Sequence, residues 1–391
     1  MSFFQFFSSF LFPSSPRSQD TLGTQQTQSI PKSTHTHTYA MVSISKAHQD
    51  FVAQFADARN YAKENEKDEI LLKENKHRFV MFPIKYHEIW AAYKKVEADF
   101  WTAEEIDYDR DVEDIDSKLN DGQKDFLARL LSTLTISEEV LNYHLIEKFS
   151  AELQNPEGKS FYGFQIMMEN IYDEIYAMMI DAYFSNSDAP TKYFKDAKTL
   201  PSLKEKIDFV DRWIKNPDSL YGERLVAFAA KEGIFLSGAH AAIFAQAQSG
   251  LLPGLAKANQ NIFRDKGNYT DFSCLLFAHL NNKPEAKIIE KIITEAVDVE
   301  KKYLADALKI EEFGVDPAQV NQYVEYTADA LLGSFGNEKV YNVANPFEFL
   351  EGKTTIGKSN FFEKQVSDFT KANENTQKAA AHEAFTFNDS F

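Results

Sequence analysis

The chain has one cysteine, Cys274, among its 391 residues, which excludes an internal disulfide framework and fits a reducing compartment. Cys274 lies in an apolar run, so we expect it to be buried and inert. Basic residues are scarce relative to acidic ones: 42 Lys and Arg against 59 Asp and Glu give a formal net charge of −17 at pH 7. This charge disfavours binding to nucleic acid or to an anionic membrane face. The acids are dense in residues 102–119, for which we predict a solvated connector.

Strand patterns are also missing. No stretch between turn signals shows sustained alternation of period two, so strands are at most incidental. The sequence has no internal repeat and no glycine loop of the kind that binds phosphates. Apolar residues make up 43% of the chain and aromatic residues 14%, with 34 Phe. The sequence therefore predicts an all-α protein with a core rich in phenylalanine.

The first 40 residues differ in composition from the rest. The apolar run MSFFQFFSSFLF is too short to span a bilayer, and no basic residue precedes it as in a secretory signal. The Ser, Thr, Gln and Pro that follow predict disorder. We expect residues 1–40 to be a disordered extension without a structural role, with a targeting segment as the alternative. A helical domain is expected over residues 41–351, followed by a flexible tail over 352–391.

Residues 161–184 predict a buried helix that contains acids. Glu169, Asp173 and Glu174 interrupt an apolar and aromatic run, and charged side chains are rarely buried without a partner. A Glu-x-x-His pair places a carboxylate and an imidazole on one helix face, which is how four-helix carboxylate proteins hold two metal ions. Here the pair is Glu169 and Tyr172, so one ligand of the motif is replaced.

Three further stretches combine a helical pattern with polar groups in apolar surroundings. They are residues 121–150 with Glu138 and Glu139, residues 220–249 with Glu232, and residues 254–280 with Lys266 and Tyr269 at i, i+3 spacing.

Several long runs resemble one known family, the small, radical-generating subunit of class I ribonucleotide reductase. The resemblance covers about residues 67–391 and implies a ferritin-like helical bundle. The runs are RFVMFPIKYHEIWAAYKK, FWTAEEIDYDRDVEDI, GKSFYGFQIMMENIY, YGERLVAFAAKEGIF, LLPGL, RD-x-G-x-x-x-DF, NPFEFLE, NFFEK and FTFNDSF.

The resemblance implies a set of six metal ligands, of which three are replaced in this chain. The replacement of both histidines by tyrosine and of one carboxylate by a cation is similar to the auxiliary, iron-free small subunit of fungi. We therefore expect the site to be vestigial, with no metal or other cofactor bound. The six positions are Glu138 (usually Asp), Glu169, Tyr172 (usually His), Glu232, Lys266 (usually Glu) and Tyr269 (usually His).

The chemistry of the replacing residues agrees with this expectation. A phenol near its ordinary pKa is a poor ligand for iron or manganese at neutral pH. Lys266 brings a positive charge to the place of the metals, and we expect its ammonium to bond at least one of the site's carboxylates. We expect Lys266 to be the only cation there, with Tyr172 and Tyr269 donating phenolic hydrogen bonds.

The radical positions of the family are altered too. Tyr176 stands at the spacing of the stable tyrosyl radical, but without metals we favour a packing role. His240 replaces a large aromatic residue near it, and Phe369 replaces a redox-active tyrosine of the tail. Trp90 corresponds to the start of the family's electron-transfer route, with an aromatic core anchor as an equal alternative.

The end of the chain combines phenylalanines at alternate positions with a free carboxylate, which suits docking in a hydrophobic groove. The resemblance implies that this peptide binds the large, substrate-reducing subunit, and a frayed terminus is the alternative. The docking residues are Phe385, Phe387, Asp389 and Phe391.

These features predict an auxiliary small subunit of ribonucleoside-diphosphate reductase, an oxidoreductase that supports deoxyribonucleotide synthesis. We expect a heterodimer with an iron-bearing sister subunit, which would contain the di-iron centre and the tyrosyl radical. We expect residence in the cytoplasm and leave the nucleus open. One alternative is an interaction protein that has lost its reductase partners. The other is a catalytic di-metal subunit in which Glu139, Asp173, Tyr172 or Asp265 substitutes for a ligand.

Overall fold

The computed structural model describes residues 45–350 apart from 75–77, 79, 143–144, 186, 188 and 198, and it leaves the side chains of residues 138–140, 142, 197 and 313 undescribed. All described residues lie in one compact unit that begins at residue 42. Within them every regular element is helical, which confirms the all-α prediction. The division into an extension, a domain and a tail stays a prediction, because residues 1–40 and 352–391 lie outside the described residues.

The described α-helices differ from the predicted ones mainly by a break after residue 233. The predicted helix 220–249 is divided into α11 and α12, and the predicted helix 121–150 is described as α6 and α7 on either side of residues 143–144, which lie outside the described residues. The helices are α2 (Lys46–Ala53), α3 (Ala56–Asn65), α4 (His87–Ala98), α5 (Asp109–Ser117), α6 (Asp121–Asn142), α7 (Leu145–Glu152), α8 (Pro156–Phe184), α9 (Ala189–Ala197), α10 (Pro201–Val210), α11 (Tyr221–Gly233), α12 (Ser237–Ala247), α13 (Pro253–Ala278), α14 (Ala286–Tyr303) and α15 (Pro317–Ser334).

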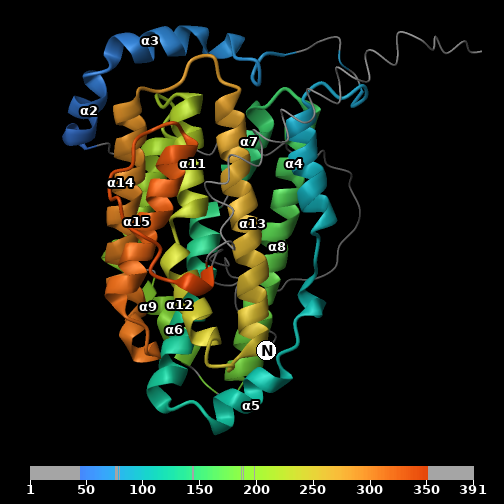
Figure 1. Ribbon diagram of the computed structural model, residues 1–391, viewed down its shortest axis with the longest axis vertical. Helices are drawn as coiled ribbons and strands as arrows, with labels where there is room; N and C mark the ends of the chain where they lie inside the picture. The colour runs from blue at the N-terminus through green and yellow to red at the C-terminus, as the bar shows by residue number, and fades with distance from the viewer. Residues whose placement is uncertain are drawn as a thin grey trace, which may run out of the picture. The chain divides into compact units, whose positions relative to one another are not determined.

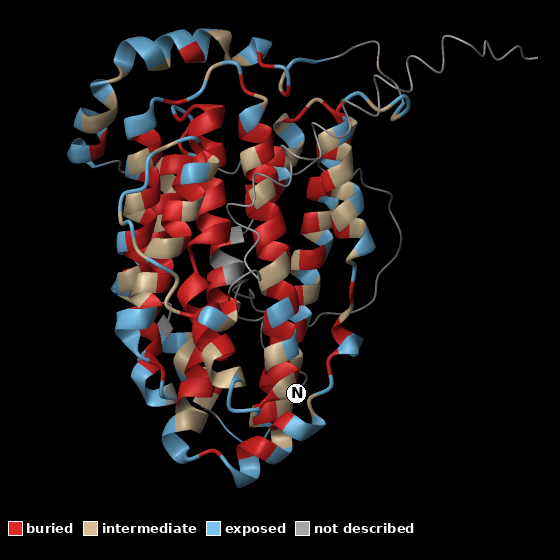
Figure 2. Cartoon of the chain, in the orientation of Figure 1, coloured by how far each residue is buried: buried red, intermediate tan, exposed pale blue. Residues whose placement is uncertain are grey.

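The long helices form a bundle around one continuous apolar core. α11 packs against α13 and α14, and α8 packs against α4, α6 and α7. Figure 1 shows α2 and α3 crossing one end of this bundle, where the Arg59 side chain bonds Glu223 in the first turn of α11, with Nε 2.8 Å from Oε1. Figure 2 shows the buried residues gathered on the inner helix faces. The ferritin-like arrangement therefore places the middle turns of α8, α11 and α13 in the interior.

Helix α8 is long because its start is capped and nothing breaks it for 29 residues. Pro156 occupies the first turn, where its missing N–H is not needed. The side chain of Asn155 accepts a hydrogen bond from the Gly158 backbone N–H at 2.7 Å. Buried positions recur at three- and four-residue spacing, so one face of the helix meets the core. Glu169 and Tyr172 are thereby brought to the centre of the bundle.

The acidic stretch 102–119 is not a solvated connector, because it contains helix α5 and two of its acids are buried. Asp111 accepts hydrogen bonds from the backbone N–H groups of Gly254 and Leu255, both at 2.8 Å, and so caps the start of α13. A Cβ atom at Gly254 would overlap the carbonyl oxygen of Asp107. This close approach requires glycine at that position and fixes where α13 begins.

A short break separates α11 from α12. Leu236, the residue before α12, lies in the left-handed region with φ of 67°, so the chain changes direction between the two helices. Its N–H donates to Glu300 Oε1 at 3.0 Å, and Glu300 Oε2 lies 2.6 Å from Lys206 Nζ in an ion pair whose two side chains are 0% exposed. The break thus depends on residues from α10 and α14, and it sets Glu232 and His240 on two separate helices.

Candidate functional site

The structure brings three of the six vestigial positions into direct contact, one each from α8, α11 and α13. Lys266 Nζ lies 3.0 and 3.1 Å from the two carboxylate oxygens of Glu169 and 3.3 Å from Glu232 Oε2. The three side chains are 7%, 12% and 0% exposed, in the order Lys266, Glu169, Glu232, so solvent screens these charges little. The expected bond from Lys266 to a carboxylate is present. Glu138 lies on α6, but its side chain is outside the described residues.

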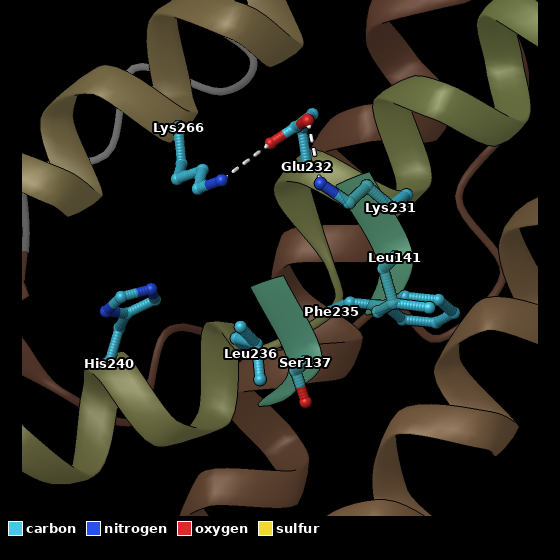
Figure 3. Close-up of a pocket in the computed structure, with 8 residues that line it drawn as sticks. All are labelled: Ser137, Leu141, Lys231, Glu232, Phe235, Leu236, His240 and Lys266. Atoms are coloured by element: carbon cyan, nitrogen blue, oxygen red, sulfur yellow. Dashed lines mark hydrogen bonds and ion pairs between the residues drawn. The ribbon is translucent and has the colours of Figure 1, made fainter. Parts of the chain in front are cut away.

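A second cation, Lys231, lies at this centre. Its Nζ is 2.9 Å from Glu232 Oε1, and its side chain is 3% exposed. Glu232 therefore forms an ion pair with a different ammonium group through each oxygen, as the two dashed lines in Figure 3 show. The expectation that Lys266 is the only cation here is wrong. Neighbours on a helix point in different directions, so the adjacency of Lys231 and Glu232 did not predict the contact, although a lysine in the apolar run LVAFAAKEGIF was a signal.

The two tyrosines of the vestigial site form a separate hydrogen-bond chain. The Tyr172 hydroxyl donates to Asp265 Oδ2 at 2.9 Å and lies 2.8 Å from the Tyr269 hydroxyl. Since the one proton of Tyr172 is directed to Asp265, Tyr269 donates to the Tyr172 oxygen. Burial raises the pKa of both phenols well above the ordinary value, with neighbouring negative charge adding to the effect. Both hydroxyls are therefore protonated at neutral pH and are unsuited to bind a metal as phenolate.

Trp101 joins this chain, whereas the expected Trp90 does not. The Trp101 Nε1–H donates to Asp265 Oδ2 at 2.7 Å, and its ring stacks on Tyr172 with centroids 6.1 Å apart. Trp90 contacts Phe82 and Tyr93 instead, with ring centroids 6.1 and 5.1 Å away, which favours the alternative of an aromatic anchor. Trp101 and Asp265 are 164 residues apart, so their contact is a product of the fold that no local pattern indicates.

Asp265 is held by further contacts. Arg264 Nε donates to Asp265 Oδ1 at 3.0 Å. Burial raises the pKa of Asp265, while Arg264 and the hydrogen bonds from Trp101 and Tyr172 oppose that rise. With both of its oxygens engaged, Asp265 is not a free ligand in the way that the catalytic alternative requires.

His240 and Tyr176 lie on buried surfaces close to this centre. His240 Nδ1 is 2.7 Å from Asn259 Oδ1, and since an amide oxygen only accepts, Nδ1 bears the proton and the ring bonds α12 to α13. Tyr176 lies one helical turn after Tyr172 on α8 and is 2% exposed. The packing role of Tyr176 stays a prediction.

The space left at the centre is small. A cavity of about 10 Å³ lies among the charged groups, roughly the room that one water molecule needs. Figure 3 shows the eight residues that line it: Ser137, Leu141, Lys231, Glu232, Phe235, Leu236, His240 and Lys266.

The described residues do not fit a pair of iron or manganese ions. Among them, no group of three or more His, Cys, Asp and Glu side chains is arranged to hold a metal. Both oxygens of Glu232 face ammonium groups, and Asp173, one of the proposed substitute ligands, is exposed on the outer face of α8. The side chain of Glu139 lies outside the described residues. In the same part of the chain, no helix is long and apolar enough to cross a membrane.

Residues 78–346 match the family described as ribonucleotide reductase, small chain, and the chain belongs to that family. It is 58% identical over 347 residues to ribonucleoside-diphosphate reductase small chain 2 of Saccharomyces cerevisiae, which covers 88% of this chain and 100% of that protein. Identity to small chain 1 of the same yeast is 49%, over 88% of this chain and 86% of that protein.

Solved structures agree with the sequence comparison. The Rnr4 homodimer of Saccharomyces cerevisiae is similar with a TM-score of 0.74 at 58% identity, over 83% of this chain and 99% of that chain. The R2 subunit of Clostridium botulinum is similar with a TM-score of 0.62 at 20% identity, which supports the fold alone and covers 69% of this chain and 89% of that one. The predicted auxiliary-type small subunit of an oxidoreductase is confirmed, and the catalytic alternative is not favoured.

Proposed function

We propose that this chain supports deoxyribonucleotide synthesis as a structural subunit that pairs with an iron-bearing sister and contains no redox cofactor of its own. The observation that supports this most directly is the set of contacts at the bundle centre. Lys231 and Lys266 contact the carboxylates that would bind metal, and two protonated phenols stand where imidazoles are usual.

The absence of a metal would follow from competition for the same oxygens. A carboxylate that is buried and paired with an ammonium group gives up that pairing when it binds a metal ion, which leaves an uncompensated cation in a dry site. Glu232 would have to give up two such contacts. A second cation close to a divalent ion also repels it strongly at low dielectric.

Pairing with a sister subunit is supported by an apolar stripe on the outer face of α8. Met167 is 40% exposed, and Phe100, which precedes the buried Trp101, is 47% exposed. Phe164 contacts Phe100 edge to face with centroids 6.3 Å apart, and Ile171 continues the stripe one turn after Met167 as a half-buried residue. Grouped apolar side chains of this kind mark protein–protein contacts. We propose that the iron-bearing sister covers this stripe.

The proposed docking of the tail on the large subunit concerns Phe385, Phe387, Asp389 and Phe391, which lie outside the described residues. The phenylalanines at alternate positions of this peptide support this part of the proposal. Residence in the cytoplasm, with the nucleus open, is proposed from the single cysteine alone.

Iron loading of the sister subunit tests the proposal. The sister is loaded anaerobically with Fe(II) and exposed to oxygen, alone and mixed with this chain, and iron and tyrosyl radical are then measured by elemental analysis and electron spin resonance. We expect more iron and radical in the mixture and neither in this chain alone. The proposal would be contradicted if this chain alone bound close to two iron ions. It would also be contradicted if the sister subunit took up as much iron alone as in the mixture.

A charge placed on the stripe provides the matched variant. Met167→Glu should weaken the pairing and remove the gain in iron. Val340→Glu serves as the control, because Val340 is similarly exposed at 41% but follows α15, outside the stripe. Equal loss of pairing in both variants would mean that the stripe is not the contact.

A further inference from the structure

Lys231 and Lys266 reach Glu232 from different helices. Lys231 is on α11 and bonds Glu232 Oε1 at 2.9 Å, while Lys266 is on α13 and lies 3.3 Å from Glu232 Oε2. Lys266 also bonds both oxygens of Glu169 on α8. The charges therefore alternate in sign along one chain of contacts that links three helices. A carboxylate that contacts a different cation through each oxygen has the connectivity of a carboxylate bridge between two metal ions.

The two ammonium groups also occupy the room at the centre. The remaining cavity has a volume of about 10 Å³ and is lined by both lysines and Glu232. The ammonium group of Lys231 has no route to solvent along its own helix, because its side chain is 3% exposed and every residue of α11 is buried. Moving its ammonium group away from Glu232 would break a buried ion pair, which is costly in a site that excludes water.

We propose that Lys231 and Lys266 together replace the two metal ions of the family, with Glu232 bridging their ammonium groups, and that Lys231 is a separate block to metal binding. This proposal rests on the proposed function, in which the chain binds no metal. The pair compensates the carboxylates of the centre and links α8, α11 and α13 without any supply of iron. Restoring the three replaced ligand positions is therefore not sufficient to recreate a metal site.

Metal content of two variants of the full chain tests this. The first is the triple variant Tyr172→His, Lys266→Glu and Tyr269→His, and the second adds Lys231→Met, which keeps the volume and removes the charge. Each is incubated anaerobically with Fe(II), desalted and assayed for iron, and its absorption spectrum is recorded after oxygen is admitted. We expect the triple variant to retain little iron and the quadruple variant to retain severalfold more, with an iron-dependent absorption band.

A matched control replaces another lysine in the triple variant. Lys95→Met removes an ammonium group that bonds Asn268 at 2.9 Å, also on α13, and it should leave the iron content unchanged. Close to two iron ions per chain in the triple variant would overturn the proposal, as would equal iron in the triple and quadruple variants. Iron in the parent chain would instead overturn the proposed function, so the two failures are distinct.

Thermal unfolding of the parent chain keeps the proposal testable if the quadruple variant does not fold. Lys231→Met should lower the melting temperature, because Glu232 loses one of its two cations. Adding Glu232→Gln should restore part of the loss, since the carboxylate charge is then gone. A Lys231→Met variant that melts with the parent would overturn the proposal.

Discussion

Replacing Lys266 by methionine tests whether the charges at the centre stabilise the bundle. Methionine keeps the length and apolar volume of the lysine stem but removes the ammonium group that bonds Glu169 at 3.0 Å and Glu232 at 3.3 Å. Removing one partner of a buried ion pair typically costs about 3–5 kcal/mol, because the other charge is left without compensation. Glu232 retains Lys231 and Glu169 is 12% exposed, so we expect a loss near the lower limit, about 3 kcal/mol.

In a domain of this size, 1 kcal/mol corresponds to roughly 2 °C in melting temperature, so Lys266→Met should melt about 6 °C below the parent at neutral pH. Circular dichroism during heating and urea titration measure the loss independently. Two controls separate charge from packing. Lys266→Arg keeps the charge and should lose less, and Lys266→Met with Glu169→Gln should regain part of the stability because the isolated carboxylate is neutralised. If Lys266→Met melts with the parent across neutral pH, the ammonium group is not structural and the reasoning fails.

Three further outcomes are expected. Burial against Trp213, aided by nearby arginines, lowers the pKa of His48 from 6.5 to about 4, so the unfolded chain takes up this proton first as pH falls. The buried, neutral His48 therefore contributes to the free energy of unfolding fully above pH 6.5, and this contribution is lost as the pH falls toward 4. His48→Phe should remove this part of the pH dependence, which is on the order of 1–2 kcal/mol. Melting curves from pH 4 to 7 would measure it. Tyr172→Phe deprives Asp265 and Tyr269 of a partner and should cost about 1–3 kcal/mol, and unchanged urea unfolding would contradict the hydrogen-bond chain. A peptide ending in FTFNDSF should compete for the large subunit in a binding assay, and Phe391→Ala should weaken the binding of the peptide by on the order of 1 kcal/mol or more. A scrambled peptide that competes equally well would refute the docking.

Sequence patterns predicted the parts of the site that depend on helical spacing. Glu169 and Tyr172 lie three residues apart on one helix, as do Lys266 and Tyr269, so their shared faces follow from the period of the α-helix. The bond between Lys266 and Glu169 could then be expected from charge alone. The contact between Lys231 and Glu232 could not be expected in this way, because it depends on the direction in which a long side chain turns in the folded core.

Contacts between residues far apart in the chain could not be predicted from sequence patterns, because they depend on how the helices pack. Trp101 meets Asp265 where α13, whose start is capped by Asp111, packs beside α8. The break after α11 depends on Glu300, whose hydrogen bond to Leu236 spans 64 residues. Periodicity predicts a face or a length, but such contacts are decided by tertiary packing.

The break between α11 and α12 has an electrostatic consequence for the centre. α11 ends at Gly233, so the partial negative charge of its C-terminal end, about half an elementary charge, lies within one turn of Lys231. Aligned peptide dipoles therefore favour an ammonium group there and disfavour an unpaired carboxylate. Had one helix continued through Ala247, this partial charge would lie more than three turns farther away. The helix end itself thus acts with Glu232 as a counter-charge for Lys231.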